Sequence, residues 1–155
     1  MICLRFSQPI RKLLGLSSAE QALLVQVFGL LVVVRAALWL IKFKKLQSLL
    51  SRVEVRGSRK LNSRAVPAER VARFVAAASR YVPRASCLTQ ALVANTLLRR
   101  AGHDAVLRVG ISRQAGTDLR AHAWVECAGK VVIGRIKDFE DFQPLPPLQM
   151  ASVGV

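Results

Sequence analysis

The chain has 155 residues, of which 52% are hydrophobic, so it can form one domain with a core plus an extension, and disorder of the whole chain is excluded. Its formal net charge of +15 predicts attraction to anionic partners, such as an acidic peptide, nucleic acid or the inner leaflet of a membrane. The basic residues form no aromatic-interleaved patch, zinc-finger spacing or P-loop, so we expect no specific nucleic-acid binding. Three cysteines without a CxxC pair predict neither a disulfide framework nor a structural zinc site, and they fit a reducing cytoplasm. No cofactor is implied.

A long helix is predicted near the N-terminus. Ser17 and Glu20 form a capping box before the apolar stretch 22–41, which ends in a basic run. The length matches a bilayer span, but Arg35 near the middle would cost about 2.5–3.5 kcal/mol there. We therefore expect residues 1–50 to form an apolar helical region packed against the rest of the protein or a partner. We expect the protein to be cytoplasmic. Peripheral contact with the membrane through residues 22–45 is left open.

Two further helices follow a basic loop at 51–65. Pro67 fits a helix start, and apolar residues recur at helical spacing until Pro83 ends the pattern. Ser86 is a good N-cap for the next helix, which runs from Cys87 to Arg100. A glycine at 102 then supplies the stop signal. We place the start of the compact domain at residue 66 and its end at residue 143.

The rest of the domain has the alternation of β-strands. Residues 105–111 are predicted to form one strand, and residues 113–118 a polar loop. Residues 121–127 and 130–133 are predicted to form a hairpin that turns at positions 128 and 129. The Pro-rich tail, 144–155, is expected to carry no regular element. Helices followed by a small antiparallel sheet give an α+β fold.

Cys87 and His122 are the candidate catalytic residues. The dipole of a helix and the free N–H groups at its start favour a thiolate, and a downstream histidine on a strand can act as the general base. His122, Trp124 and Glu126 share one face of their strand, so we expect His122 to look toward the Cys87 helix. Trp124 is expected to pack beside the imidazole and shield it. Cys127 lies on the opposite face and is interpreted as a small core residue.

Four blocks of sequence, in this order and spacing, resemble a known enzyme family. They are residues 86–92, 97–102, 107–111 and 121–126. The chain is similar to the leader peptidase of bacterial lasso-peptide biosynthesis, in its stand-alone, microcin-processing form. That family is a small branch of the transglutaminase-like, papain-related cysteine peptidases. The resemblance implies a nucleophile-bearing helix packed on a small antiparallel sheet, with Cys87 as the nucleophile and His122 as the general base.

The resemblance also implies partners. The substrate would be a ribosomally made precursor peptide, from which the leader is cleaved before an ATP-dependent macrocyclase closes the core peptide into a ring. Fused relatives carry a small winged-helix domain that binds the leader. The apolar N-terminal region has no room for such a domain, so a separate leader-recognition protein is implied.

One position departs from the family pattern. Many relatives carry an aspartate twelve residues after the histidine, where it holds the imidazole in one tautomer, and here that position is Gly134. Asp138 is the nearest carboxylate beyond the strand, followed by Glu140 and Asp141. We take Asp138 as the candidate third residue, with a backbone carbonyl as the alternative.

Other functions remain open. The missing aspartate would suit a catalytically silent transglutaminase-like scaffold, and the charge would suit a basic membrane-associated adaptor; either would bind the precursor or the cyclase. Acyl transfer to an amine proceeds through the same thioester as hydrolysis, so it is not excluded.

Overall fold

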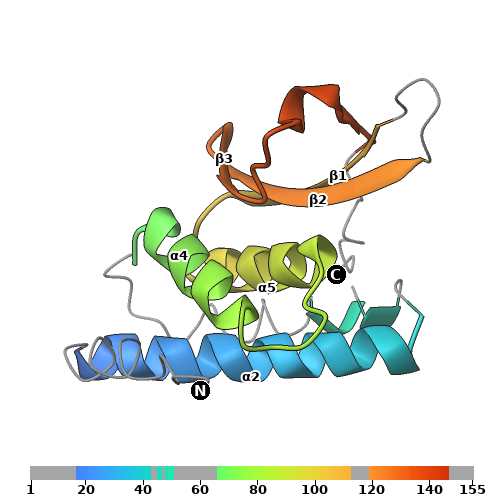
Figure 1. Cartoon of the computed structure of the whole chain (residues 1–155). Coiled ribbons are helices and arrows are strands. Elements are labelled where there is room, and N and C mark those ends of the chain that lie inside the picture. Colours follow the sequence, from blue (N-terminus) through green and yellow to red (C-terminus); the bar gives the residue numbers. More distant parts are fainter. Residues whose placement is uncertain (1–16, 43–44, 47, 51–65, 113–118, 147–155) are drawn as a thin grey trace, which may run out of the picture.

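The computed structural model describes residues 17–42, 45–46, 48–50, 66–112 and 119–146. Figure 1 shows three layers: an antiparallel sheet, the helices α4 (Ala68–Ser79) and α5 (Cys87–Arg100), and the long helix α2 (Ser18–Leu40). The sheet packs on α4 and α5, and these two helices pack on α2. The α+β class, the small antiparallel sheet and the long apolar N-terminal helix are confirmed.

Helix α2 begins where the capping box predicts. The Ser17 side chain accepts from the Glu20 backbone N–H, and the Glu20 carboxylate accepts from the Ser17 backbone N–H at 3.0 Å. The carboxylate of Glu20 also pairs with Arg70 of α4 at 3.0 Å, which ties the start of α2 to the domain. The long helix is therefore part of the folded unit.

Helix α4 ends earlier than its apolar pattern suggests. The pattern extends to Val82, but the helix stops at Ser79. The backbone N–H groups of Tyr81 and Val82 bond to carbonyls three residues earlier, so the chain tightens into a turn. Pro83 has no backbone N–H and disfavours helical conformation at Val82, so the α-helix cannot continue through this turn. Val82 is nevertheless buried, as its place in the pattern predicts.

Helix α5 has the predicted bounds. Ser86 is the N-cap, and its side chain accepts from the Thr89 backbone N–H at 3.3 Å. At the other end Gly102 has a φ of 84°, and the N–H of His103 bonds to the Leu98 carbonyl at 3.0 Å, which is the Schellman pattern.

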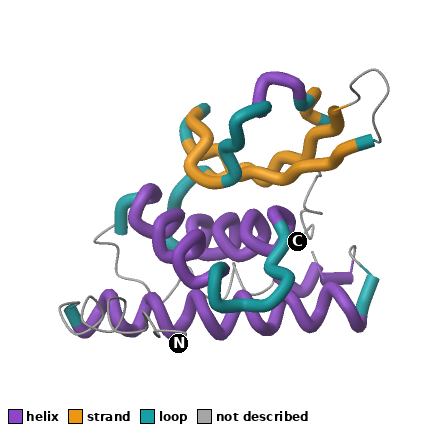
Figure 2. Tube along the Cα trace, in the orientation of Figure 1, coloured by secondary structure: helices purple, strands orange, loops and turns teal. Residues whose placement is uncertain are grey.

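The sheet has the strand order β3-β2-β1-β4. Its strands are β1 (Ala105–Ser112), β2 (Arg120–Cys127), β3 (Lys130–Ile133) and β4 (Gln143–Pro144). The β2–β3 hairpin turns at Ala128 and Gly129, both with positive φ, as predicted. A bulge at the pairing of Val125 and Glu126 shifts the register of this hairpin, and no sequence signal announced it. Figure 2 shows the strands stacked over the purple helices.

The Pro-rich tail begins with a short strand, which corrects one expectation. Gln143 and Pro144 pair with Ile111 and Gly110, and the N–H of Leu145 bonds to the Val109 carbonyl at 2.8 Å. A proline is tolerated here because β4 is an edge strand and needs no donor at that position. The predicted loops at 51–65 and 113–118 and most of the tail, 147–155, lie outside the described residues.

The core lies between the sheet and the helices. Its sheet side consists of alternate, small or medium side chains: Ala105, Leu107, Ala123, Val125, Cys127 and Ile133. The opposite face of the sheet carries a separate aromatic cluster of Trp124, Phe139 and Phe142. Phe139 belongs to the short 3-10 helix η1 (Phe139–Asp141), which lies above the sheet in Figure 1.

Candidate active site

Cys87 is the first residue of α5 and is half-buried against the core. The turn before it includes Arg84 at a φ of 57°. Within the described residues, the backbone N–H groups of Cys87 and Leu88 have no hydrogen-bond partner, because the cap bonds serve only the next two positions. The thiol therefore stands beside two free donors.

His122 is held by one short hydrogen bond. Its Nε2 lies 2.6 Å from the carbonyl oxygen of Gly134. A carbonyl can only accept, so Nε2 carries the proton, and in the neutral imidazole Nδ1 is the free acceptor. The tautomer that a carboxylate would select in a triad is thus selected here by the backbone.

Gly134 could not be replaced by a larger residue without strain. Its φ is 93°, and a Cβ at this position would lie 2.7 Å from the Trp124 Cβ and 2.8 Å from the Ala123 carbonyl oxygen. The close approach of the backbone at this position brings its carbonyl to His122. The aspartate that the resemblance leads one to expect is missing at a position where this backbone has no space for a side chain.

Asp138 contacts Arg120 instead of the imidazole. Its carboxylate lies 3.4 Å from the guanidinium, and both side chains are about half exposed. Glu140 and Asp141 belong to η1. The geometry favours the backbone carbonyl over Asp138 as the group that orients His122.

The prediction that His122, Trp124 and Glu126 share one face of their strand is correct, but the prediction that this face points toward α5 is wrong. His122, Trp124 and Glu126 do share a face: the two rings stack with centroids 6.4 Å apart, and Trp124 donates to Glu126 at 2.9 Å. The face that packs on α5 is the opposite one, with Ala123 and Val125. The small apolar side chains of Ala123 and Val125 allow α5 to approach, whereas the face with the larger side chains of His122, Trp124 and Glu126 is turned toward η1.

Aromatic side chains surround the imidazole on this outer face. The Phe142 ring is centred 5.5 Å from His122, and the Arg120 guanidinium lies over the same phenyl ring. Phe139 meets Trp124 edge-on at 5.0 Å, so Trp124 is buried as well as placed beside His122. The packing role expected of Trp124 is confirmed, and its shielding of the imidazole stays a prediction. Sequence reasoning missed both phenylalanines, whose only signal was their place in an acidic segment before the prolines.

Cys87 and His122 lie at the same end of the layers. Strand β1 starts next to the C-terminal end of α5 and runs back along the helix, so its last residue, Ser112, and its partner Arg120 lie toward the N-terminal end. His122 is two residues further along β2. Within the described residues no hydrogen bond joins Cys87 to His122. Any reaction between them requires the two groups to meet around this end of the sheet.

Cys127 and His103 lie in surroundings that indicate a structural role. Cys127 is buried, and burial, with smaller contributions from the charges of Asp104 and Glu69, raises the pKa of its thiol. Its interpretation as a core residue is confirmed. His103 is bonded through Nε2 to the Val66 carbonyl at 2.8 Å, which links the turn after α5 to the start of the domain. In the described part of the chain, no three His, Cys, Asp or Glu side chains are grouped to hold a metal.

The chain matches a family model described as the transglutaminase-like superfamily, over residues 30–146. This range includes both Cys87 and His122 and begins inside α2. No curated protein and no solved structure gives a significant match.

Proposed function

The chain belongs to the transglutaminase-like superfamily, and we propose that it is a cysteine peptidase that removes the leader from a ribosomally synthesised lasso-peptide precursor. The superfamily includes cysteine peptidases, and the four sequence blocks around Cys87 and His122 support the leader-peptidase branch. The observation that carries the proposal is the bond from His122 Nε2 to the Gly134 carbonyl, because it leaves Nδ1 as a proton acceptor.

In the proposed reaction Cys87 Sγ attacks the carbonyl carbon at the end of the leader. Nδ1 of His122 takes the thiol proton and returns it to the amine nitrogen of the core peptide as the peptide bond breaks. In this mechanism the N–H groups of Cys87 and Leu88, which have no partner within the described residues, stabilise the negative oxygen of the tetrahedral intermediate. Water then hydrolyses the thioester, with His122 again as the base, and releases the leader as an acid.

Proton transfer requires Sγ and Nδ1 to come within hydrogen-bond distance. The described residues contain no such bond, and His122 lies on the sheet face away from α5, so the proposed mechanism requires the two groups to move together when the substrate binds. The same observation favours a second function, a silent scaffold that binds the precursor or the cyclase without cleaving it. In either function we propose a separate leader-recognition protein and an ATP-dependent macrocyclase as partners. We place the protein in the cytoplasm, in contact with the membrane through residues 22–45.

One experiment separates the two functions. The purified chain is mixed with a recognition protein and a lasso-peptide precursor, and leader release is followed by mass spectrometry. A peptidase releases the leader, forms a transient thioester on Cys87 and is inactivated by iodoacetamide. Binding of the precursor without release, under conditions where a related peptidase is active, would establish the scaffold instead.

A further inference from the structure

Helix α2 is apolar on both sides, but the domain covers only one of them. Val27, Leu31 and Val34 are fully buried against the helices of the domain. The exposed face between residues 25 and 40 is also apolar and spans an arc of roughly 140° on a helical projection. This exposed face consists of Val25, Phe28, Gly29, Val32, Val33, Ala36, Trp39 and Leu40.

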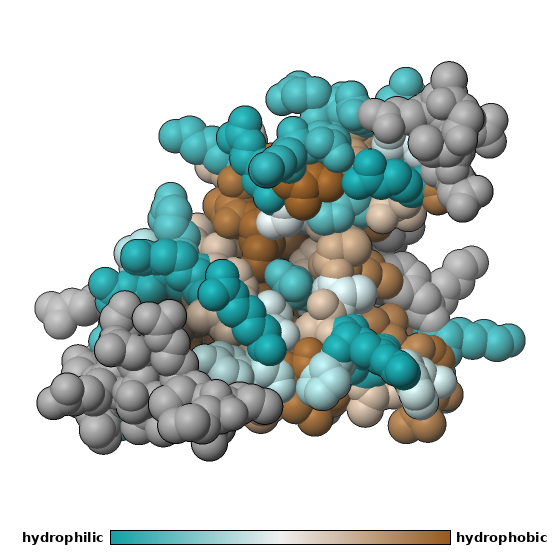
Figure 3. Space-filling view, viewed as in Figure 1, coloured by the Kyte–Doolittle hydropathy of each residue, from teal (hydrophilic) through white to brown (hydrophobic). Residues whose placement is uncertain are grey.

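The polar residues of this segment lie at the borders of the exposed face. Gln26 is at one edge, and Arg35 is at the other. Trp39 is 71% exposed and Leu40 is 81% exposed, so the apolar surface continues to the end of the helix. Figure 3 shows brown, hydrophobic side chains along the lower edge of the molecule, where α2 runs. A continuous apolar face of this kind marks an interaction site.

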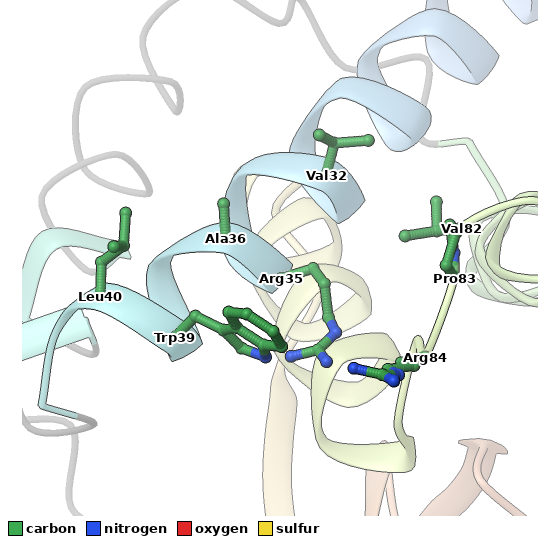
Figure 4. Close-up of a pocket in the computed structure, with 8 residues that line it drawn as sticks. All are labelled: Val32, Arg35, Ala36, Trp39, Leu40, Val82, Pro83 and Arg84. Carbon is green, nitrogen blue, oxygen red and sulfur yellow. The ribbon is translucent and has the colours of Figure 1, made fainter.

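An open pocket of about 530 Å³ adjoins this face. Its walls are apolar side chains of α2 and of the turn after α4, and it contains two arginines, Arg35 and Arg84. Figure 4 shows the two guanidinium groups pointing toward one another beside the Trp39 ring. The Arg35 guanidinium lies 5.4 Å from the centre of that ring. Within the described residues, neither arginine pairs with a carboxylate. Two neighbouring cations that have no carboxylate partner among the described residues favour an anion between them.

The surrounding sequence adds to this charge. No acidic residue occurs from position 21 to position 53, and Lys42 and Lys45 follow the end of α2. The domain covers one apolar face of α2, and the other is bordered by Arg35 and ends in Trp39; buried apolar area and nearby cations both contribute to binding at a membrane interface. Within the face itself only Trp39 carries a polar side-chain atom, so a protein partner would find few hydrogen-bonding groups there.

We propose that α2 lies in the plane of a bilayer, with its exposed face among the acyl chains and the phosphate of an anionic phospholipid between Arg35 and Arg84. The helix is long and apolar enough to span a membrane, but spanning would expose Val27, Leu31 and Val34 to lipid and break their packing on the domain. When α2 lies in the plane of the membrane, the domain covers one of its apolar faces and lipid covers the other. The domain then sits on the membrane with the sheet, whose strand β2 contains His122, on the side away from it.

This inference deepens the membrane contact proposed above, and it does not depend on the peptidase activity. Its first test is sedimentation of the full chain, and of its Cys87→Ala variant, with vesicles of phosphatidylcholine alone or mixed with phosphatidylglycerol. Both proteins should bind the anionic vesicles and bind them less at high salt. The double variant R35Q/R84Q should lose about thirtyfold in affinity for them, because each cation near an anionic surface contributes to binding. Arg73 is exposed and lies outside the pocket, so the variant Arg73→Gln serves as a control that removes one positive charge elsewhere.

The apolar face is tested with Val33→Glu, which should weaken vesicle binding at least tenfold. Leu119→Glu introduces the same charge at an exposed apolar residue that precedes β2 and should have no effect. Circular dichroism should show that both variants are folded. Equal binding of Val33→Glu and wild type, or no vesicle binding with assembly of the chain into dimers, would overturn the proposal.

Depth measurements separate a helix in the plane from a helix that spans. Trp39 and Trp124 are the two tryptophans, and Trp124 is buried. In the background W124F, lipids brominated near the headgroups should quench Trp39. In a second variant that combines W124F, W39F and Phe28→Trp, the single tryptophan at position 28 should be quenched by the same lipids, which are brominated near the headgroups. A spanning helix would place position 28 near the bilayer centre, and deep quenching there would refute the in-plane arrangement.

Discussion

Replacing Gly134 by the family's aspartate should damage this protein rather than improve it. The substitution forces a φ of 93° on an L-residue, which costs about 1–2 kcal/mol. Its Cβ would lie 2.7 Å from the Trp124 Cβ and 2.8 Å from the Ala123 carbonyl oxygen, and overpacking of this kind costs about 1–3 kcal/mol. Together, Gly134→Asp should lower the free energy of unfolding by about 2–5 kcal/mol, a fall in Tm of roughly 5–15 °C.

Thermal unfolding followed by circular dichroism measures this loss, and Gly129→Asp is the matched control. Gly129 also has a positive φ, 75°, but nothing lies within 4 Å of its Cβ position. Its substitution should therefore cost only the conformational part, about 1–2 kcal/mol. Leader release by Gly134→Asp should fall, because the strain moves the carbonyl that holds His122. Wild-type stability together with raised activity would show that the loop accepts a carboxylate there and would refute the reasoning.

Three further changes test the candidate site, and a fourth tests the core. Cys87→Ala should abolish leader release and leave Tm nearly unchanged, since the side chain is half-buried and makes no hydrogen bond within the described residues; retained cleavage would contradict the mechanism. His122→Ala should lower kcat/KM by about 10²–10⁴-fold, whereas His103→Ala should spare turnover and cost about 1 kcal/mol of stability through its lost hydrogen bond. Asp138→Asn should leave turnover unchanged, because its partner is an exposed guanidinium; a fall in turnover at constant precursor affinity would assign the orienting role to this carboxylate. Burial raises the pKa of the Cys127 thiol, so the unfolded chain loses this proton at a lower pH than the folded chain. The free energy of unfolding should therefore fall above about pH 8.5 in wild type, and Cys127→Ala should not show this fall.

The helices were predictable because their signals are local. Ser17 and Ser86 cap the two helices that they were expected to cap, and Gly102 ends α5. A cap depends on contacts within four residues, so the sequence is enough to place it. The end of α4 was predicted less well, because the apolar pattern continues through Val82 into a turn that is also buried.

The direction of the His122 face could not be predicted, since alternation tells only which residues share a face. Two sets alternate along β2, and both are buried in part. Ala123 and Val125 contact the helices, while His122 and Trp124 lie under a segment that reaches them from β3. Only the tertiary packing of Phe139 and Phe142 decides between the two, and these residues are far along the chain from β2.

The sequence left the orienting group of His122 open between Asp138 and a backbone carbonyl, because a carbonyl has no sequence signature. A search by residue type finds carboxylates, and it therefore led to Asp138, whose side chain pairs with Arg120. Gly134 was read as the loss of an aspartate. In the structure the absence of its side chain allows the backbone to approach Trp124, and the same approach places the carbonyl 2.6 Å from Nε2. A carboxylate stabilises the imidazolium by charge as well as by a hydrogen bond, and the carbonyl supplies only the hydrogen bond. A peptidase built in this way should keep the required tautomer but stabilise the protonated base less than an aspartate would.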